Sequence, residues 1–446
     1  MPVKKVIKRS GRLVAFDPKR ITNAVFKAAL AMEGDNMDRA EEVSATVTKK
    51  LHDYYGEDNP PSVEDIQDVV IETLREMDHG RTANAYAQHR AEHARLREEK
   101  ESQIVVEDTI PYKILWRVHT WNVEHGCHSV EALNEQVQGK GWPKLVEAGE
   151  EFYHLGIQET VEKILRRRDT LRIVIVAGPS SSGKTTTTYK IAEGLEAEGI
   201  KLVSRGFDNY FKNLDSHPKD EFGDYNFETP EALDLDLIND HLLALLRGES
   251  IQMPRYNFKT GLREEETDEF HLEENHLLLI DSLHGLYGPM TSSVPDGLKF
   301  KLYIEAMCQV RDMKGEFVRW ADLRMLRRMV RDSWHRSYSP AMTVGHWHYV
   351  RRSEMRHIVP FIGKVDHAIN GSLAYELPVL AKHMGPRMGA ILEEYRDNPK
   401  RYDAFVRAQR VHDLLASLAP ISEAQEATIP PKSLMREYIG GSDYEY

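Results

Sequence analysis

Residues 171–190, LRIVIVAGPSSSGKTTTTYK, decide the fold of this chain. A run of β-branched apolar residues gives way to small residues and then to helix formers, which predicts a strand, a loop and a helix in succession. Gly178, Gly183, Lys184 and Thr185 have the spacing of a phosphate-binding loop, and this loop lies between the strand and the helix as its chemistry requires. We therefore expect a nucleotide at this loop.

The loop also predicts which groups hold that nucleotide. Its glycines let backbone N–H groups turn toward the phosphates at the start of the helix. Lys184 is expected to reach the β- and γ-phosphates as a catalytic cation, and Thr185 to bind a magnesium ion. The expected ATP-binding residues are Gly178, Ser180, Ser181, Ser182, Gly183, Lys184, Thr185 and Thr186. The motif says nothing about the group that receives the phosphate.

Further short apolar runs lie beyond the loop and indicate a parallel sheet with crossover helices. They are KLVSRGF (201–207), HLLLID (276–281) and KFKLYIEA (299–306). Asp208 comes directly after the first of these runs, at the edge of the sheet where ligands of open α/β folds gather. A carboxylate there can take a proton from an attacking hydroxyl group, although a turn or helix-cap aspartate has the same local sequence.

The sequence pattern divides the chain of 446 residues into three parts. Residues 1–100 predict two short strands and several helices, one of which starts with a capping box formed by Ser62 and Asp65. Residues 101–170 predict a mostly helical connector that packs on the third part, because its apolar positions have helical spacing. Residues 171–446 form that third part, the α/β domain with the phosphate loop. No internal repeat is found.

Composition excludes several function classes. With 41% hydrophobic and 29% charged residues and no long apolar run, we expect no membrane span. The basic start lacks the apolar segment of a secretory signal, and the two cysteines, Cys127 and Cys308, fit a reducing compartment, so we expect a cytoplasmic protein. A net charge of −12 argues against a nucleic-acid partner. His335, His346, His348 and His357 lack the spacing of a zinc site.

From the helical lead-in near residue 120 to residue 446, the chain resembles the phosphoribulokinase and uridine kinase family, in particular bacterial uridine kinase-like nucleoside kinases. The motifs that carry the resemblance, in order, are AGPSSSGKTT, FDNYF, YNFETPEALD, PRYNFKTGLR, LLLIDSLHGLYG, RMLRRMVRDSWHRSYSP, WHYVRRSE and SLMREYIGGS. The resemblance implies a P-loop kinase with a parallel sheet and a mobile helical lid. It also implies transfer of the ATP γ-phosphate to a sugar-type hydroxyl group.

The resemblance assigns roles to individual residues. Asp208 falls on the catalytic base, and Asp281 on a magnesium-associated glutamate of the family. Arg327, Arg328 and Arg331 fall on the basic helix before the lid, with Arg336 beyond it, where guanidinium groups can neutralise the transferring phosphoryl group. The implied substrate-binding residues are Tyr210, Glu228, Tyr256, Phe258, Arg263 and Arg328, of which Glu228 holds the ribose hydroxyls and the aromatic pair flanks the base. The alternative interpretation is that Tyr256 and Phe258 belong to the core and that the arginine-rich helix is a solvated face.

One departure bears on the substrate. Uridine kinases of the family place a base-reading histidine shortly after the aromatic pair, whereas this chain has Gly261 there. A site selects strongly only through polar groups that the wrong ligand leaves unpaired, so the choice of a pyrimidine does not follow.

The front 100 residues resemble an ATP-cone, a nucleotide-sensing module. The matching stretches are VIKRSGRLVAFDPKRI, PSVEDIQDVVIETL and YAQHRAEHARLRE, over residues 3–97. Lys8 and Arg9 match phosphate-contacting positions, and Arg20 stands where lysine is usual. The resemblance implies a regulatory site for ATP or dATP and a homo-oligomer, while a basic structural surface is the alternative reading.

The sequence thus predicts a kinase that uses ATP and Mg²⁺ to phosphorylate a hydroxyl group of a nucleoside or related small molecule. Two alternatives stay open: a kinase of a phosphorylated metabolite, such as a sugar phosphate or glycerate phosphate, and a nucleotide-sensing regulator without turnover. The intact set Lys184, Thr185, Asp208 and Arg327 argues against the last of these.

Overall fold

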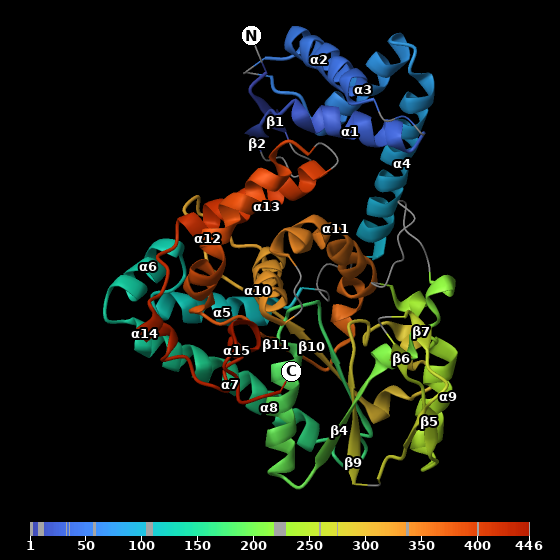
Figure 1. Cartoon of the computed structure of the whole chain (residues 1–446), viewed down its shortest axis with the longest axis vertical. Coiled ribbons are helices and arrows are strands. Elements are labelled where there is room, and N and C mark those ends of the chain that lie inside the picture. The colour runs from blue at the N-terminus through green and yellow to red at the C-terminus, as the bar shows by residue number, and fades with distance from the viewer. Residues whose placement is uncertain are drawn as a thin grey trace. The chain divides into compact units, whose positions relative to one another are not determined.

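The structure is a computed structural model, and it contains two compact units. It describes residues 3–7, 13–32, 34, 36–56, 59–103, 110–217, 229–257, 260–273, 275–335, 339–398 and 401–445, with the side chains of 92–103 and 334–335 left out. The first unit comprises residues 1–105 with 398–402, and the second comprises residues 106–397 with 403–446. Each unit is taken by itself below (Figure 1).

The first unit is a small strand pair with four helices. Strands β1 (Lys5–Ile7) and β2 (Leu13–Ala15) pair antiparallel, and helices α1 (Lys19–Leu30), α2 (Met37–Tyr54), α3 (Val63–Glu76) and α4 (Gly80–Gln103) come next. The predicted capping box at the start of α3 is confirmed, since the side chains of Ser62 and Asp65 each bond the backbone N–H of the other. Buried apolar residues such as Phe26, Leu51 and Leu74 form its core.

The second unit is built on a five-stranded parallel sheet in the order β11-β10-β3-β9-β4. The strands are β3 (Ile173–Ala177), β4 (Lys201–Gly206), β9 (His276–Asp281), β10 (Lys299–Glu305) and β11 (His367–Asn370). The predicted parallel α/β fold is therefore confirmed. Strand β11 and two small antiparallel pairs, β5 (Ile251–Met253) with β8 (Asp268–Phe270) and β6 (Tyr256–Asn257) with β7 (Leu262–Arg263), were not predicted.

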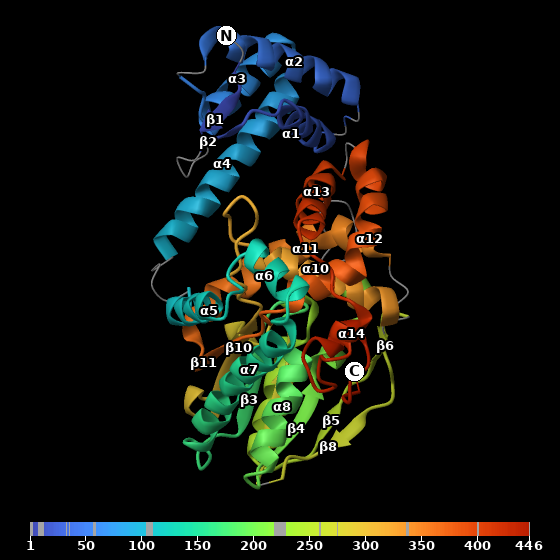
Figure 2. The ribbon, with the colours of Figure 1, turned by 90° about the vertical axis from the view of Figure 1, so that its left-hand side faces the viewer.

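Both faces of the sheet are covered, which explains why every residue of β3 is buried. Ile173 and Ile175 point to one face, where helix α9 (Leu235–Leu246) packs. Val174 and Val176 point to the other, where α7 (Trp142–Leu165) and α8 (Lys184–Glu196) lie side by side (Figure 2). The phosphate loop therefore begins at the end of a strand that is packed on both faces.

The remaining elements surround this core. They are α5 (Tyr112–Glu124), α6 (Val130–Gln138), α10 (Trp320–His335), α11 (Pro340–His357), α12 (Glu376–Arg396), α13 (Tyr402–Ala416), α14 (Glu423–Glu426), α15 (Arg436–Ile439) and the 3₁₀ turns η1 (Phe207–Tyr210), η2 (Leu214–Ser216), η3 (Pro230–Ala232), η4 (Gly288–Thr291), η5 (Asp296–Leu298) and η6 (Val359–Lys364). The helices expected in the connector, α5 to α7, belong to the second unit, where α7 contacts α8 and β11. None of the described helices combines the length and apolarity that a membrane span needs.

Candidate active site

The phosphate loop joins β3 to α8 and has no room for side chains at its two glycines. A Cβ atom on Gly178 would lie 2.2 Å from the carbonyl oxygen of Ile304. Gly183 has a φ of +94°, and a Cβ atom there would lie 2.4 Å from Leu434 Cδ1. Both positions therefore require glycine, one for a close approach to β10 and one for a left-handed turn as well.

Side chains behind the loop hold two of its carbonyl groups. Arg324 donates to the carbonyl oxygen of Ser180 at 3.1 Å, and Arg327 donates to that of Ser181 at 3.4 Å. The hydroxyl group of Tyr438 also donates to Ser181 O, at 3.2 Å. Ser181 itself has a φ of +59°, which is uncommon for a residue other than glycine. Carbonyls held toward the protein interior leave successive N–H groups free to form an anion-binding concavity.

Lys184 and Thr185 occupy the first turn of α8. The ammonium group of Lys184 donates to the carbonyl oxygens of Gly178 and Pro179, at 2.9 and 3.3 Å. Both side chains are half-buried. The next residue, Thr186, is fully buried and bonds to the carboxylate of Glu437 instead.

The two predicted carboxylates end neighbouring strands. Asp281 closes β9 in register with Gly206 of β4 and Val176 of β3, and Asp208 stands two residues after Gly206 in η1. Burial raises the pKa of Asp208, against the opposing charge of Lys184. Burial also raises the pKa of Asp281, where Lys184 lowers it and the charges of Asp208 and Glu437 raise it. The four charged groups therefore act on one another at the same edge of the sheet.

The donor set fits a magnesium ion of the kind that kinases bind. A threonine hydroxyl at Thr185 and a carboxylate at Asp281 are hard oxygen donors, and Mg²⁺ in such sites takes few protein ligands beside nucleotide phosphates and water. Within the described ranges, no group of three or more His, Cys, Asp or Glu side chains is arranged to hold a metal. A site of two oxygen donors completed by a nucleotide is consistent with that finding.

The arginines of α10 lie in two different environments. Arg327 is fully buried, pairs with Glu376 at 2.6 Å and donates to the carbonyl of Gly371 at 2.7 Å. It supports the loop from behind, whereas the sequence predicted that it closes over the phosphates. Arg328 and Arg331 are partly exposed and both pair with Asp332, at 3.3 and 3.1 Å. Arg336 lies outside the described residues.

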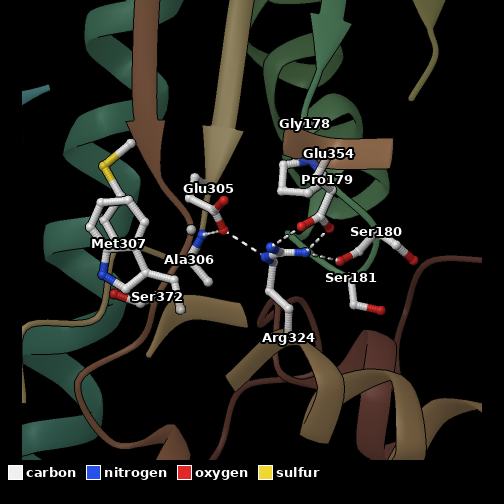
Figure 3. Close-up of polar contacts among 12 residues, drawn as sticks. Gly178, Pro179, Ser180, Ser181, Glu305, Ala306, Met307, Arg324, Glu354 and Ser372 are labelled. Carbon is white, nitrogen blue, oxygen red and sulfur yellow. Dashed lines mark hydrogen bonds and ion pairs between the residues drawn. The ribbon is translucent and has the colours of Figure 1, made fainter. Parts of the chain in front are cut away.

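Arg324, which the sequence analysis did not single out, is at the centre of a buried charge network (Figure 3). Its guanidinium group pairs with Glu305 at 2.8 Å and with Glu354 at 2.5 Å, and all three side chains are almost fully buried. Glu305 ends β10 and Glu354 lies on α11. The network joins the sheet, α10, α11 and the phosphate loop. Arg324 begins the motif RMLRRMVRDSWHRSYSP and Glu354 ends WHYVRRSE, but the sequence does not show that they pair, because the partners of Arg324 come from three distant segments.

The predicted substrate residues in the described ranges brace the segment that carries Asp208. Tyr210 is buried and its hydroxyl group lies 2.9 Å from Nδ1 of His241. Arg263 donates to the carbonyl oxygens of Tyr210 and Phe211, both at 2.9 Å, and pairs with Asp234 at 3.0 Å.

Tyr256 is also buried, with its ring 5.5 Å from that of Phe211. Glu228 and Phe258 lie outside the described residues. A side chain at Gly261 would clash, since its φ is +70° and a Cβ atom would lie 2.9 Å from Leu214. This backbone therefore excludes a histidine at that position.

His284 is a further candidate that the sequence analysis did not name individually, although it stands in the motif LLLIDSLHGLYG. It lies in the turn after Asp281, is 4% exposed, and neither ring nitrogen has a hydrogen-bond partner among the described residues. Its ring meets that of His357 edge to face at 5.7 Å. Burial, with the charges of His357 and Lys184, lowers the pKa of His284 to about 3, so the ring is neutral at pH 7.

The first unit has a cavity of its own. It measures about 540 Å³ and lies between α1 and α2, where Lys19, Thr48, Lys49 and His52 are among its lining residues. The predicted Arg20 does not line it, and its guanidinium group lies 3.7 Å from Asp17. Lys8 and Arg9 lie outside the described residues. The cations at Lys19 and Lys49 were missed because helical lysines read as a solvated face.

Two family models match the chain. One, described as the ATP cone domain, covers residues 4–95, and one, described as the phosphoribulokinase / uridine kinase family, covers residues 173–372. The uridine kinase of Bacillus pumilus is 34% identical over 167 residues, which are 37% of this chain and 70% of that enzyme. The uridine kinase of Chloroflexus aurantiacus is 32% identical over 160 residues, 36% of this chain and 67% of that enzyme. Among solved structures, D-glycerate 3-kinase from Cryptococcus neoformans aligns with a TM-score of 0.25 and 14% identity over 58% of this chain and 87% of that one.

With the phosphate loop and the parallel sheet described above, these matches define the class as an ATP-dependent kinase. The chain belongs to the phosphoribulokinase and uridine kinase family, and its front unit is an ATP-cone. Members of the family act on a hydroxyl group of a small molecule, and so does this enzyme.

Proposed function

We propose that this kinase transfers the γ-phosphate of ATP to a hydroxyl group of a nucleoside or a closely related small molecule. The observation that carries the proposal is the meeting of Lys184, Asp208 and Asp281 at one edge of the sheet, beside the phosphate loop. The relatives named uridine kinase support a nucleoside as the acceptor.

In the proposed mechanism each residue has one task. N–H groups of the loop bind the phosphates, and Lys184 neutralises charge on the transferring phosphoryl group. Asp208 accepts the proton of the acceptor hydroxyl, which its raised pKa favours because a base works best when its pKa approaches the working pH. Thr185 and Asp281 would hold Mg²⁺, which supplies positive charge to the phosphates. The partly exposed Arg328 and Arg331 are better placed than Arg327 to reach the nucleotide.

A phosphorylated metabolite is the second candidate acceptor, and two observations favour it. The base-reading histidine of the family is absent, and the backbone at Gly261 excludes its replacement there. In addition, α11 carries Arg351, Arg352 and Arg356, which a second phosphate group could use.

The front unit is proposed to sense ATP or dATP in the cavity between α1 and α2 and to change the kinase through a change of oligomeric state. Lys19 and Lys49 at the cavity can each contact a phosphate group, while Glu41 and Asp53 also line it, so the support for triphosphate binding comes from these two side chains and not from a net positive charge. An ATP-cone has no chemistry of its own, so its nucleotide must act through differential contacts in two states. We also propose that the protein is located in the cytoplasm.

A screen for ADP release decides between the acceptors. The full chain is assayed with Mg²⁺–ATP against nucleosides, sugar phosphates and glycerate phosphates, with Lys184→Ala as the inactive control. Turnover of a nucleoside that exceeds turnover of every phosphorylated compound supports the proposal, and the reverse order replaces it with the second candidate. If no compound releases ADP above the Lys184→Ala background, the chain acts as a regulator without turnover.

A further inference from the structure

The C-terminal segment 421–445 packs against the back of the phosphate loop and along α8 (Figure 1). This segment contains α14 and α15 and includes the stretch SLMREYIGGS, quoted above among the motifs of the family resemblance. The matching model of the kinase family covers residues 173–372 and does not include the segment. The contacts of the segment with the loop are specific and buried.

Glu437 caps the first turn of α8 from the far end of the chain. Its carboxylate accepts the hydroxyl of Thr186 at 2.7 Å and the backbone N–H of Thr186 at 3.4 Å, and Glu437 is 5% exposed. The residue at the N-cap of α8 is Gly183, which has no side chain to make such a bond. An N–H group in the first helical turn has no partner within the helix, and a carboxylate there is favoured by the helix dipole. Glu437 thus replaces the missing cap.

Two neighbours of Glu437 touch the loop itself. Tyr438 donates its hydroxyl to the carbonyl of Ser181 at 3.2 Å, and the guanidinium group of Arg327 lies 5.1 Å from the centre of its ring. Leu434 fills the space beside Gly183. The segment therefore contacts the loop at its middle and at the start of α8.

We propose that residues 433–438 are a component of the nucleotide site, in which Glu437 is a positioning residue for Mg²⁺–nucleotide. It acts through Thr186 by fixing the first turn of α8, while Tyr438 fixes the carbonyl of Ser181. The inference rests on the assignment of the phosphate loop to ATP proposed above.

Calorimetry with Mg²⁺–ADP on the full chain tests the inference without any acceptor. Because the ATP-cone also binds nucleotide, the kinase site is defined as the binding event that Lys184→Ala removes. Glu437→Ala is expected to weaken binding at this site by roughly 5-fold, which corresponds to the typical cost of about 1 kcal/mol for loss of a helix cap. Glu437→Gln keeps an oxygen acceptor for Thr186 and is expected to stay within about 3-fold of the wild type.

Two comparisons separate positioning from a general loss of stability. Lys432→Ala breaks the exposed pair of the same segment with Glu193 and is the matched control, expected to bind as the wild type does. Thr186→Val removes the hydroxyl group that donates a hydrogen bond to Glu437. In the double variant, the loss of binding free energy should therefore be smaller than the sum of the losses in the two single variants. Additive effects, or binding by a folded Glu437→Ala variant within about 2-fold of the wild type, overturn the inference.

A second variant is used if circular dichroism shows that Glu437→Ala does not fold. Tyr438→Phe removes only the hydroxyl bond to Ser181 and is expected to weaken Mg²⁺–ADP binding by about 3-fold or more. Unchanged binding by this variant then overturns the inference. If Lys184→Ala removes no binding event, the assignment of the loop to ATP fails, and that outcome is distinct from a failure of the segment's role.

Discussion

Asp208 is the proposed catalytic base, and its burial as a carboxylate also lowers the stability of the folded protein. We expect Asp208→Asn to lower turnover by about 10²–10⁴-fold and to leave Mg²⁺–ATP binding nearly unchanged, because an amide cannot accept the proton of the acceptor hydroxyl. Steady-state rates on the acceptor found by the screen, with calorimetry for ATP, measure both. The exposed Asp215→Asn, seven residues on, is the control. A variant with more than about a tenth of wild-type turnover would show that Asp208 is not the base.

The same substitution has an opposite effect on folding. The folded protein holds the Asp208 proton more tightly than the unfolded chain does, so the free energy of unfolding falls as the pH rises through the raised pKa. Asp208→Asn has no carboxyl group to ionise, so this fall in the free energy of unfolding does not occur in the variant. At pH 7 we therefore expect it to unfold at the same or a higher temperature than the wild type. A melting temperature several degrees lower would contradict the raised pKa.

His284 should behave in the same way. Two buried ring nitrogens without hydrogen-bond partners among the described residues destabilise the folded state. His284→Leu is therefore expected to keep or raise the melting temperature, which thermal unfolding followed by circular dichroism measures. A melting temperature several degrees lower would contradict a cost from the two unpaired nitrogens.

For individual residues, the sequence predicted those features that depend on neighbouring positions in the chain. The phosphate loop and the place of Asp208 after a strand could be predicted, since each stands next to an apolar run, whereas Asp281 was assigned only through the family resemblance. Glu437 stands in the quoted motif SLMREYIGGS, but its contact with the loop could not be predicted, because its partner Thr186 is 251 positions away. Arg327 was placed over the phosphates, since a sequence does not show that Glu376 neutralises it inside the core.

Among the elements, the sheet was predicted where its strands are apolar. The runs at β3, β4, β9 and β10 were read correctly because buried parallel strands are nearly continuous in β-branched and leucine residues. Strand β11, His367–Asn370, was missed since it is short, half-polar and at the edge of the sheet. The two-residue pairing of β6 with β7 depends on contacts rather than on pattern.

Helix α10 contributes Arg324, whose loss should weaken the whole kinase unit. Arg324→Met leaves Glu305 and Glu354 buried without their shared cation, so we expect the free energy of unfolding to fall by about 3–5 kcal/mol. Denaturation by urea, followed by circular dichroism, measures the change. Arg247→Met, which breaks an exposed pair with Glu249, is the control and should unfold as the wild type does. Equal midpoints for the two variants would contradict the stabilising role of the network.

For the whole molecule, the presence of an ATP-cone in the same chain as a kinase unit predicts that nucleotide changes both the oligomeric state and the activity. We expect ATP or dATP above catalytic need to change both the mass of the enzyme in solution and its rate, because a sensing unit acts only through a difference between two states. Light scattering and steady-state rates across a nucleotide titration measure the two responses. Lys8→Ala with Arg9→Ala should remove both and leave the intrinsic rate unchanged.

The cavity of the first unit supplies a second variant for this experiment. Ala45→Trp places a large ring at its lining on α2 and should block the same responses. Constant mass and one hyperbolic rate curve, identical in the wild type and both variants, would mean that the front unit does not regulate. A response that survives Ala45→Trp but not the double variant would locate the nucleotide outside the cavity.

The link between Glu437 and Thr186 also sets an order in time. The ribosome makes the phosphate loop and all five strands before it makes Glu437, which comes 251 positions after Thr186. At about 5–20 residues per second, translation leaves the first turn of α8 without its cap for on the order of ten to fifty seconds. If Glu437 positions the first turn of α8 as proposed, a nascent chain can build the sheet long before it can hold a nucleotide firmly, and nucleotide binding reaches full strength only after residue 437 has been added.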